Sequence, residues 1–133
     1  MNSTLDYSKE RQDIWYELSV LFLDTEPSQG DLSRIVERLA ASSFSSSELI
    51  MIMEDEVAPI LHTNLLCMAG QWGMFDRDED VIQPILARMR ALNGNPARGW
   101  PFFLFLKRKF HMMNVEADWH KILDRVSLLR RES

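Results

Sequence analysis

The sequence has a single cysteine and no apolar stretch long enough to cross a membrane. Cys67 has no partner within the chain for a disulfide, and its apolar neighbours favour a buried, inert thiol over a reactive one. No strictly apolar run is longer than five residues, the length reached for example at 49–53 and 102–106, whereas a transmembrane helix needs about 20. The N-terminus also lacks the basic and apolar parts of a secretory signal. We therefore expect a cytoplasmic protein that makes no membrane contact.

The sequence also lacks the motifs of familiar enzymes and metal sites. No P-loop, G-x-G-x-x-G or G-x-S-x-G occurs, and the three histidines form no HxxxH or HExxH pattern. The acids of 76–80 have D-x-D-x-D spacing, but Val81 and Ala87 stand where a calcium-binding EF-hand needs glycine and glutamate. We expect no catalytic residues, no metal and no cofactor. An enzyme without a recognisable motif remains an alternative.

The chain has enough apolar material for one core. Of its 133 residues, 46% are hydrophobic, and they include four Trp and seven Phe. A single domain of this length buries roughly two-thirds of the surface that its unfolded chain exposes. No internal repeat is apparent, and the serine-rich stretch 42–47 is too short to link two domains. The composition indicates a single compact domain over 1–133, with a flexible N-terminus at 1–7.

Apolar periodicity and capping signals predict helices in the first half of the chain. The first helix is expected over 8–22, because its apolar residues form one stripe: Ile14, Leu18, Leu21 and Phe22, with Trp15 at the edge. Ser28 with Asp31, and Ser45 with Glu48, resemble capping boxes that open a second and a third helix. The run 49–53 is apolar on every side, which favours a helix packed between others, with a buried strand as the alternative.

The second half of the chain is also predicted to be helical. Pro59 is expected to precede a turn and a short helix over 60–69, and Asp80 with Gln83 to cap the next helix, which places Pro84 in its first turn. A short helix, or a strand, is expected over 102–110. The last helix has an apolar face formed by Val115, Trp119, Ile122, Leu123 and Val126. The predicted fold is all-α, with five to six helices around one core.

Charge is divided unevenly along the chain. Residues 1–80 carry 16 acidic and 5 basic side chains, a net charge of −11, whereas residues 81–133 carry 4 acidic and 10 basic ones, a net charge of +6. Such a division indicates either a surface that meets a cationic partner or a chain that neutralises itself. A basic segment flanked by aromatics, 107–109, is typical of nucleic-acid binding, but the pI near 5.2 argues against that partner.

Three consecutive acids are expected at the C-terminal end of the third helix. Glu54, Asp55 and Glu56 would meet the negative end of the helix dipole there, which costs about 0.3–1 kcal/mol each. The ordinary interpretation is a solvated face, or pairing with the basic tail. The functional interpretation is that the three acids bind a cationic partner.

Further acids and one tryptophan are candidates for the same surface. Asp76, Asp78, Glu79 and Asp80 either stabilise a helix start or contact the partner. Asp24 and Glu26 follow the first helix, where loop acids are often merely solvated. Trp72 lies between two glycines, and it either anchors an interface or packs in the core.

Several blocks of the first 80 residues resemble a bacterial family of small uncharacterised domains. The opening, WYELSVLFLDTE at 15–26, matches the pattern W-x-x-L-S-x-L-F-L-D-T-E, and the likeness continues at 39–42, 55–59, 64–66, 69–72 and 75–76. The tail after residue 80 departs from the pattern. This family has no assigned catalytic residues, so the resemblance gives none that could be transferred to this chain.

The size, helical content and acidity are also similar in type to the immunity proteins of contact-dependent growth-inhibition systems. This resemblance implies a protein that binds and neutralises a cognate toxin domain, a cationic nuclease, through an acidic surface. The alternative from the charge pattern is a helical adaptor or a homodimer in which the acidic half of one copy meets the basic tail of another.

Overall fold

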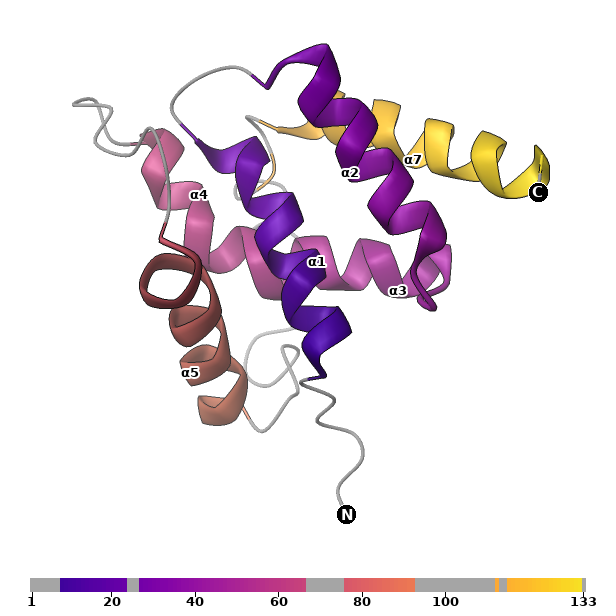
Figure 1. The fold of residues 1–133 in the computed structure, drawn as a ribbon. Coiled ribbons are helices and arrows are strands. Elements are labelled where there is room, and N and C mark those ends of the chain that lie inside the picture. The colour runs from indigo at the N-terminus through magenta and orange to yellow at the C-terminus, as the bar shows by residue number, and fades with distance from the viewer. Residues whose placement is uncertain (1–7, 24–26, 67–75, 93–111, 113–114, 133) are drawn as a thin grey trace, which may run out of the picture.

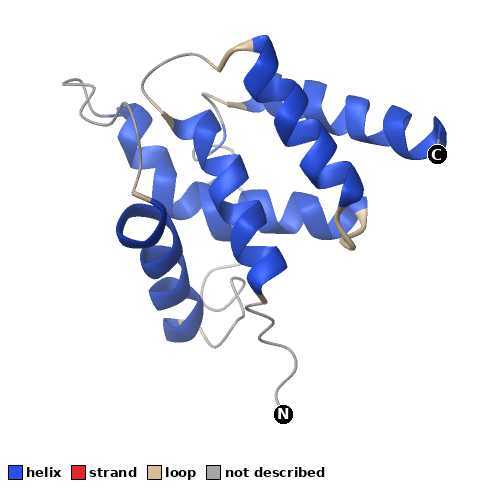
Figure 2. Ribbon diagram, in the orientation of Figure 1, coloured by secondary structure: helices blue, strands red, loops and turns tan. Residues whose placement is uncertain are grey.

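The computed structural model describes residues 8–23, 27–66, 76–92, 112 and 115–132. Every regular element in these ranges is a helix, so the predicted all-α fold is confirmed (Figure 2). In chain order the elements are α1 (Lys9–Ser19), the 3₁₀ turn η1 (Val20–Phe22), α2 (Gln29–Ala41), α3 (Ser46–Met51), the π-helical η2 (Ile52–Val57), α4 (Ala58–Leu66), the π-helical η3 (Arg77–Ile82), α5 (Gln83–Ala91) and α7 (Glu116–Glu132).

The helix α1 lies across the middle of the molecule (Figure 1). Behind it, α3, η2 and α4 form one continuous helix, while η3 and α5 form a second continuous helix on one side. On the other side lies α2, against which α7 packs. Because α1 contacts η2, η3 and α2, its residues decide how the three parts fit together.

One hydrophobic core joins all the helices that the structure describes. The predicted stripes of α1 and α7 face this core, as do Leu32, Ile35, Val36 and Leu39 of α2. Trp15, expected at the edge of its stripe, is instead fully buried, because α1 has neighbours on several sides. The largest fully buried side chains are Trp15, Trp119, Phe22, Leu18, Ile35, Leu39, Leu49, Ile52, Met53, Ile85, Ile122 and Val57.

Both predicted capping boxes are present. In α2 the Asp31 backbone N–H donates to the Ser28 hydroxyl, and the Ser28 N–H donates to the Asp31 carboxylate, each over 3.0 Å. Ser45 and Glu48 make the same reciprocal pair at the start of α3. These bonds satisfy backbone donors that a helix start leaves without partners.

Two predicted helix boundaries are wrong. Pro59 does not precede a turn, because the helix that begins at α3 runs through it into α4. The helix containing Pro84 is capped by Asp76, whose carboxylate accepts from the Glu79 N–H, and not by Asp80 with Gln83. Exposed Ile50 and Met51 also show that the third helix is not covered on every side.

The two errors have one physical cause, a π-helical turn before each proline. Proline has no N–H, and its ring clashes with the carbonyl four residues earlier in an α-helix. One residue before each proline, the N–H bonds five residues back: Ala58 to the Met53 carbonyl and Gln83 to the Asp78 carbonyl. The wider turn therefore lets the helix continue through the proline.

These two regions also form a short internal repeat, contrary to the sequence prediction. EDEVAPIL at 54–61 aligns with EDVIQPIL at 79–86, and η3 and α5 each begin 25 residues after η2 and α4 and have the same lengths. The shared pattern is Glu-Asp, then an aliphatic residue two positions later, then Pro-Ile-Leu. Two acidic runs of the chain thus lie on equivalent π-helical segments.

One arginine of α7, Arg130, caps the C-terminal end of α2. The Arg130 guanidinium donates to the carbonyls of Phe44 over 2.7 Å, Leu39 over 3.0 Å, Ala40 over 3.3 Å and Ser42 over 3.4 Å. The last carbonyls of a helix have no intrahelical donors, and a cation there also favours the helix dipole. Arg130 therefore supplies the C-terminal cap of α2 from another helix.

Replacing Arg130 with Ala should lower the free energy of unfolding by about 1–2 kcal/mol, because several carbonyls lose their donor. Urea denaturation measures this change. Arg90→Ala removes an exposed arginine from the end of α5 and serves as the matched control. Equal effects of the two substitutions would contradict the capping role of Arg130.

The α2 capping box should make stability depend on pH. The backbone N–H and hydroxyl of Ser28, aided by Arg34, hold the pKa of Asp31 below its ordinary value. A lowered carboxyl pKa contributes stability that is complete above the unfolded-state pKa and is lost as the pH falls through the folded-state pKa. The stability difference between the wild type and Asp31→Ala should therefore be constant near pH 7 and shrink below about pH 4. For the control variant Gln29→Ala, the difference in stability from the wild type should not change with pH.

Candidate functional site

The polar residues of α1 each reach a different neighbour. Glu10 accepts hydrogen bonds from Ser43, in the turn between α2 and α3. Arg11 pairs with η2, Asp13 with η3, and Glu17 with α2. Polar side chains of α1 thus contact α2, the turn between α2 and α3, η2 and η3.

The most buried of these contacts is the Glu56 cluster, formed by Arg11, Trp15 and Glu56. Arg11 Nε donates to Glu56 Oε1 over 3.0 Å, and Nη2 donates to Oε2, so the pair is bidentate. The Trp15 indole N–H donates to Oε1 over 2.9 Å. The Glu56 residue is only 2% exposed. Arg11 also lies over the Phe44 ring, 5.6 Å from its centroid, a favourable cation–π contact.

A second polar contact supports the same region. Pro59 cannot donate to the Asp55 carbonyl four residues before it, and Arg88 of α5 donates to that carbonyl over 2.7 Å. Burial lowers the pKa of the Arg88 guanidinium, while the carboxylates of Asp55 and Glu56 act in the opposite direction. The proline inside the helix is therefore compensated from a neighbouring helix.

The prediction that all three acids of 54–56 form an exposed surface is wrong. Asp55 is 7% exposed and Glu56 is 2% exposed, so both lie inside the fold. The helix continues past them, and the π-helical turn directs Glu56 toward α1, where it pairs with Arg11 rather than with the basic tail. Glu54 alone is half-exposed.

The acids of 76–80 lie in the first turn of η3 and divide into two roles. Asp76 is the N-cap, and the Asp80 carboxylate accepts from the Asp76 N–H over 2.7 Å. Asp78 and Glu79 are exposed and engage no side chain among the described residues. We call these four residues the acidic turn. Helix capping and an open acidic surface are both present in it.

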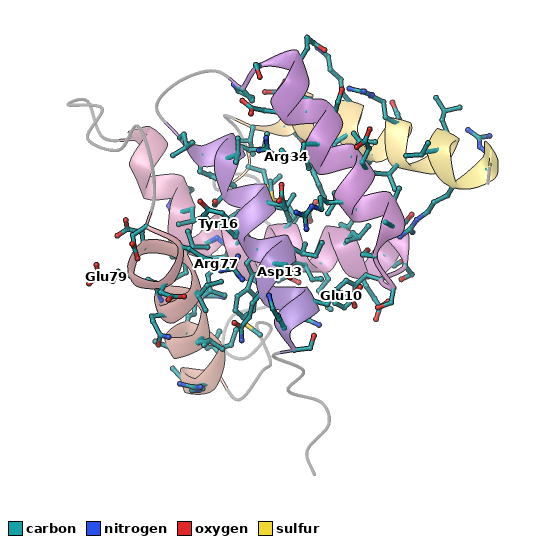
Figure 3. All side chains as sticks on the ribbon, viewed as in Figure 1. Glu10, Asp13, Tyr16, Arg34, Arg77 and Glu79 are labelled. Atoms are coloured by element: carbon teal, nitrogen blue, oxygen red, sulfur yellow. The ribbon has the colours of Figure 1, made fainter. Side chains whose placement is uncertain are left out.

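Arg77, which lies between Asp76 and Asp78 of the acidic turn, contacts α1. It donates to the Asp13 carboxylate, and its guanidinium lies 5.3 Å from the Tyr16 ring centroid (Figure 3). Partial burial works to raise the pKa of Asp13, but Arg77 and Lys9 together hold it below its ordinary value. This contact has the reverse polarity of the Glu56 cluster, since here α1 supplies the acid and the π-helix the base.

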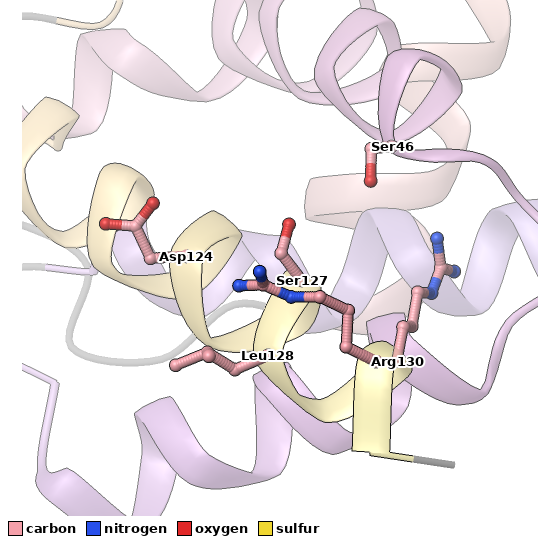
Figure 4. Close-up of a pocket in the computed structure, with 6 residues that line it drawn as sticks. Ser46, Asp124, Ser127, Leu128 and Arg130 are labelled. Carbon is pink, nitrogen blue, oxygen red and sulfur yellow. The ribbon is translucent and has the colours of Figure 1, made fainter.

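Several predicted residues lie outside the described ranges: Asp24, Glu26, Cys67, Trp72, His111 and the segments 102–110 and 107–109. Within the described part of the chain, no three His, Cys, Asp or Glu side chains gather as a metal site would require. No helix there is long and apolar enough to cross a membrane. A depression of about 750 Å³ lies between α7 and the start of α3 (Figure 4).

Comparison with known proteins gives a family. A model described as a domain of unknown function, DUF7079, matches residues 9–125. The chain belongs to the DUF7079 family. The DUF7079 match runs from the first residue of α1 into α7, so it includes the Glu56 cluster and the acidic turn. No curated protein and no solved structure matched the chain.

Sequence reasoning missed the partners Arg11, Arg77 and Arg88. A signal for Arg11 was available, because Arg11, Trp15, Leu18 and Phe22 follow the spacing i, i+4, i+7, i+11. An arginine on an apolar helical stripe needs a buried acid as partner. No such local signal exists for Arg77 and Arg88.

Glu56→Met should destabilise the fold by about 3–5 kcal/mol, because it leaves the Arg11 charge buried without its counter-ion. Arg11→Met should have a comparable effect. The double variant R11M/E56M should cost less than either single one, since no buried charge remains. Urea denaturation of the four proteins measures this cycle.

Lys9→Met is the control for this cycle, because the Lys9–Asp13 pair is exposed and should contribute less than about 1 kcal/mol. Additive effects of Arg11→Met and Glu56→Met in the double variant would contradict a coupled buried pair.

Proposed function

We propose that this protein is an immunity protein, which binds a cationic toxin domain, a nuclease, and neutralises it. The acidic turn is the contact surface: Asp76, Asp78, Glu79 and Asp80. The observation that supports the proposal is the exposure of Asp78 and Glu79 without side-chain partners among the described residues. The capping hydrogen bonds use only the carboxylates of Asp76 and Asp80. Asp78 and Glu79 favour the helix dipole from the first turn, and their carboxylates remain open to a partner.

The electrostatics of the whole chain favour such a partner. The net charge is −5, and the first 80 residues hold most of the acids. A nuclease needs a positive cleft to bind phosphates. An acidic protein is steered to that cleft by the long-range field, and carboxylates then form charge-assisted hydrogen bonds with Lys and Arg.

Contacts with the rest of the fold hold the acidic turn in place. Arg77 within it is held by Asp13 and Tyr16 of α1, and Val81 and Ile82 directly after it are buried in the core. Charges on a fixed element lose less conformational freedom on binding than charges on a mobile loop. Asp55 and Glu56 take no part in this surface, whereas Asp24, Glu26 and Trp72 remain candidate contacts.

The double variant D78K/E79K should weaken binding to the toxin domain encoded beside this protein by a factor of 10 or more, since attraction becomes repulsion. Isothermal titration calorimetry at several salt concentrations measures the affinity and its salt dependence. The affinity of the wild type should fall as salt rises, and that of the variant should fall less steeply.

The matched control is E37K/E116K, which changes the net charge equally at exposed positions of α2 and α7. If D78K/E79K binds as tightly as this control, with an unchanged salt dependence, the acidic turn is not the contact surface. If the wild type does not bind or inhibit the toxin, the immunity function is rejected.

A further inference from the structure

An exposed stripe runs along the outer side of α7. Its members recur at intervals of three and four residues, which keeps them on one side of a helix: Ala117, Lys121, Asp124, Leu128 and Arg131. The opposite side of α7 carries the core residues and the Arg130 cap of α2. The stripe is therefore the side that the fold leaves uncovered among the described residues.

The stripe has one large apolar side chain, Leu128, between the charged residues Asp124 and Arg131. Leu128 is 52% exposed, and its neighbour Leu129 is 39% exposed, the most exposed pair of large aliphatic side chains in the described residues. Asp124 precedes Leu128 by one turn and Arg131 follows it by one turn. Neither charged side chain has a hydrogen bond or an ion pair within the described part of the chain.

We infer that this stripe binds the same stripe of a second copy, so that two α7 helices pair antiparallel around Leu128. Along a helix axis Asp124 lies about 6 Å before Leu128, and Arg131 lies about 4.5 Å after it. A two-fold axis near Leu128 therefore brings Asp124 close to Arg131 of the partner subunit, and the same contact repeats on the other side.

Charge also decides the direction of pairing. Antiparallel pairing places opposite charges together on both sides of the two leucines. Parallel pairing in register would place Asp124 beside Asp124 of the partner subunit and the two Arg131 side chains together, which is unfavourable. The stripe is thus self-complementary in only one orientation, as a symmetric dimer requires.

The surface on either side of the stripe has room for a second helix. The depression of about 750 Å³ is lined by Ser46 of α3 and by Ser127, Leu128 and Arg131 of α7 (Figure 4). A smaller one of about 280 Å³ lies between α2 and α7. Asp124 lines both, so the stripe forms the ridge between two hollows.

This contact is independent of the acidic turn, which lies on η3. A helix pair buries less surface than a standard interface, so the dimer is expected to be weak. It differs from the homodimer suggested by the charge division, because both residues of each ion pair belong to α7 rather than to the acidic half and the basic tail.

Sedimentation equilibrium of the full chain, at concentrations up to about 1 mM, tests the inference. The wild type should form dimers, and Asp124→Arg or Arg131→Asp should each raise the dissociation constant at least about tenfold. The double variant D124R/R131D restores opposite charges across the axis and should return the constant to within a factor of about three of the wild type.

Glu37→Arg, an exposed charge change on α2, is the control and should leave the dimer intact. Circular dichroism melting should give equal midpoints for all variants at low concentration. A monomeric wild type at every concentration overturns the inference, and so does a dimer that tolerates Asp124→Arg or is not restored in the double variant. The toxin-binding variant D78K/E79K should dimerise normally, which separates this result from the proposed function.

Discussion

The bidentate pair between Arg11 and Glu56 is the contact on which the arrangement of helices depends. A buried charge without a counter-ion is expensive, so α1 can occupy the centre of the fold only with Arg11 opposite Glu56. The Trp15 N–H occupies a further lone pair of the same carboxylate. A change in the register of α1 against η2 would break all three hydrogen bonds at once. The pair therefore fixes one position of α1 among the alternatives that apolar packing alone would allow.

The two π-helical segments show how one local pattern serves two purposes. Each places an acidic run before a proline and lets the helix continue. In η2 the segment lies in the middle of a long helix beneath α1, and two of its three acids, Asp55 and Glu56, are buried. In η3 the segment begins a helix at the edge of the molecule, so Asp78 and Glu79 face solvent. The two segments also differ in sequence at the positions that matter, because the buried Glu56 aligns with the buried Val81, and the exposed Asp78 aligns with the buried Met53.

The charge division of the chain also has a different meaning once the fold is known. Three arginines of residues 81–133 donate to backbone or hydroxyl oxygens: Arg88 at Asp55, Arg125 at Ser33 and Arg130 at the end of α2. These contacts contribute to the fold. They do not neutralise the exposed acids of η3, which retain their negative electrostatic potential. The acidic turn and the α7 stripe lie on different helices, so the proposed toxin contact and the proposed pairing with a second copy can be tested separately.

The sequence alone determined the elements that depend on near neighbours. The apolar stripes of α1 and α7 and the capping boxes at Ser28 and Ser45 involve residues three or four apart, and all were predicted correctly. The acids at 76–80 were also correctly placed near a helix start. Only the tertiary structure decided that Glu56 is buried, because its partner Arg11 lies 45 residues away. It likewise decided that helices pass through Pro59 and Pro84, since a π-helical turn is stable only where packing and a distant donor such as Arg88 support it. Periodicity records which side of a helix is apolar, whereas the burial of a charge depends on what the rest of the chain brings against it.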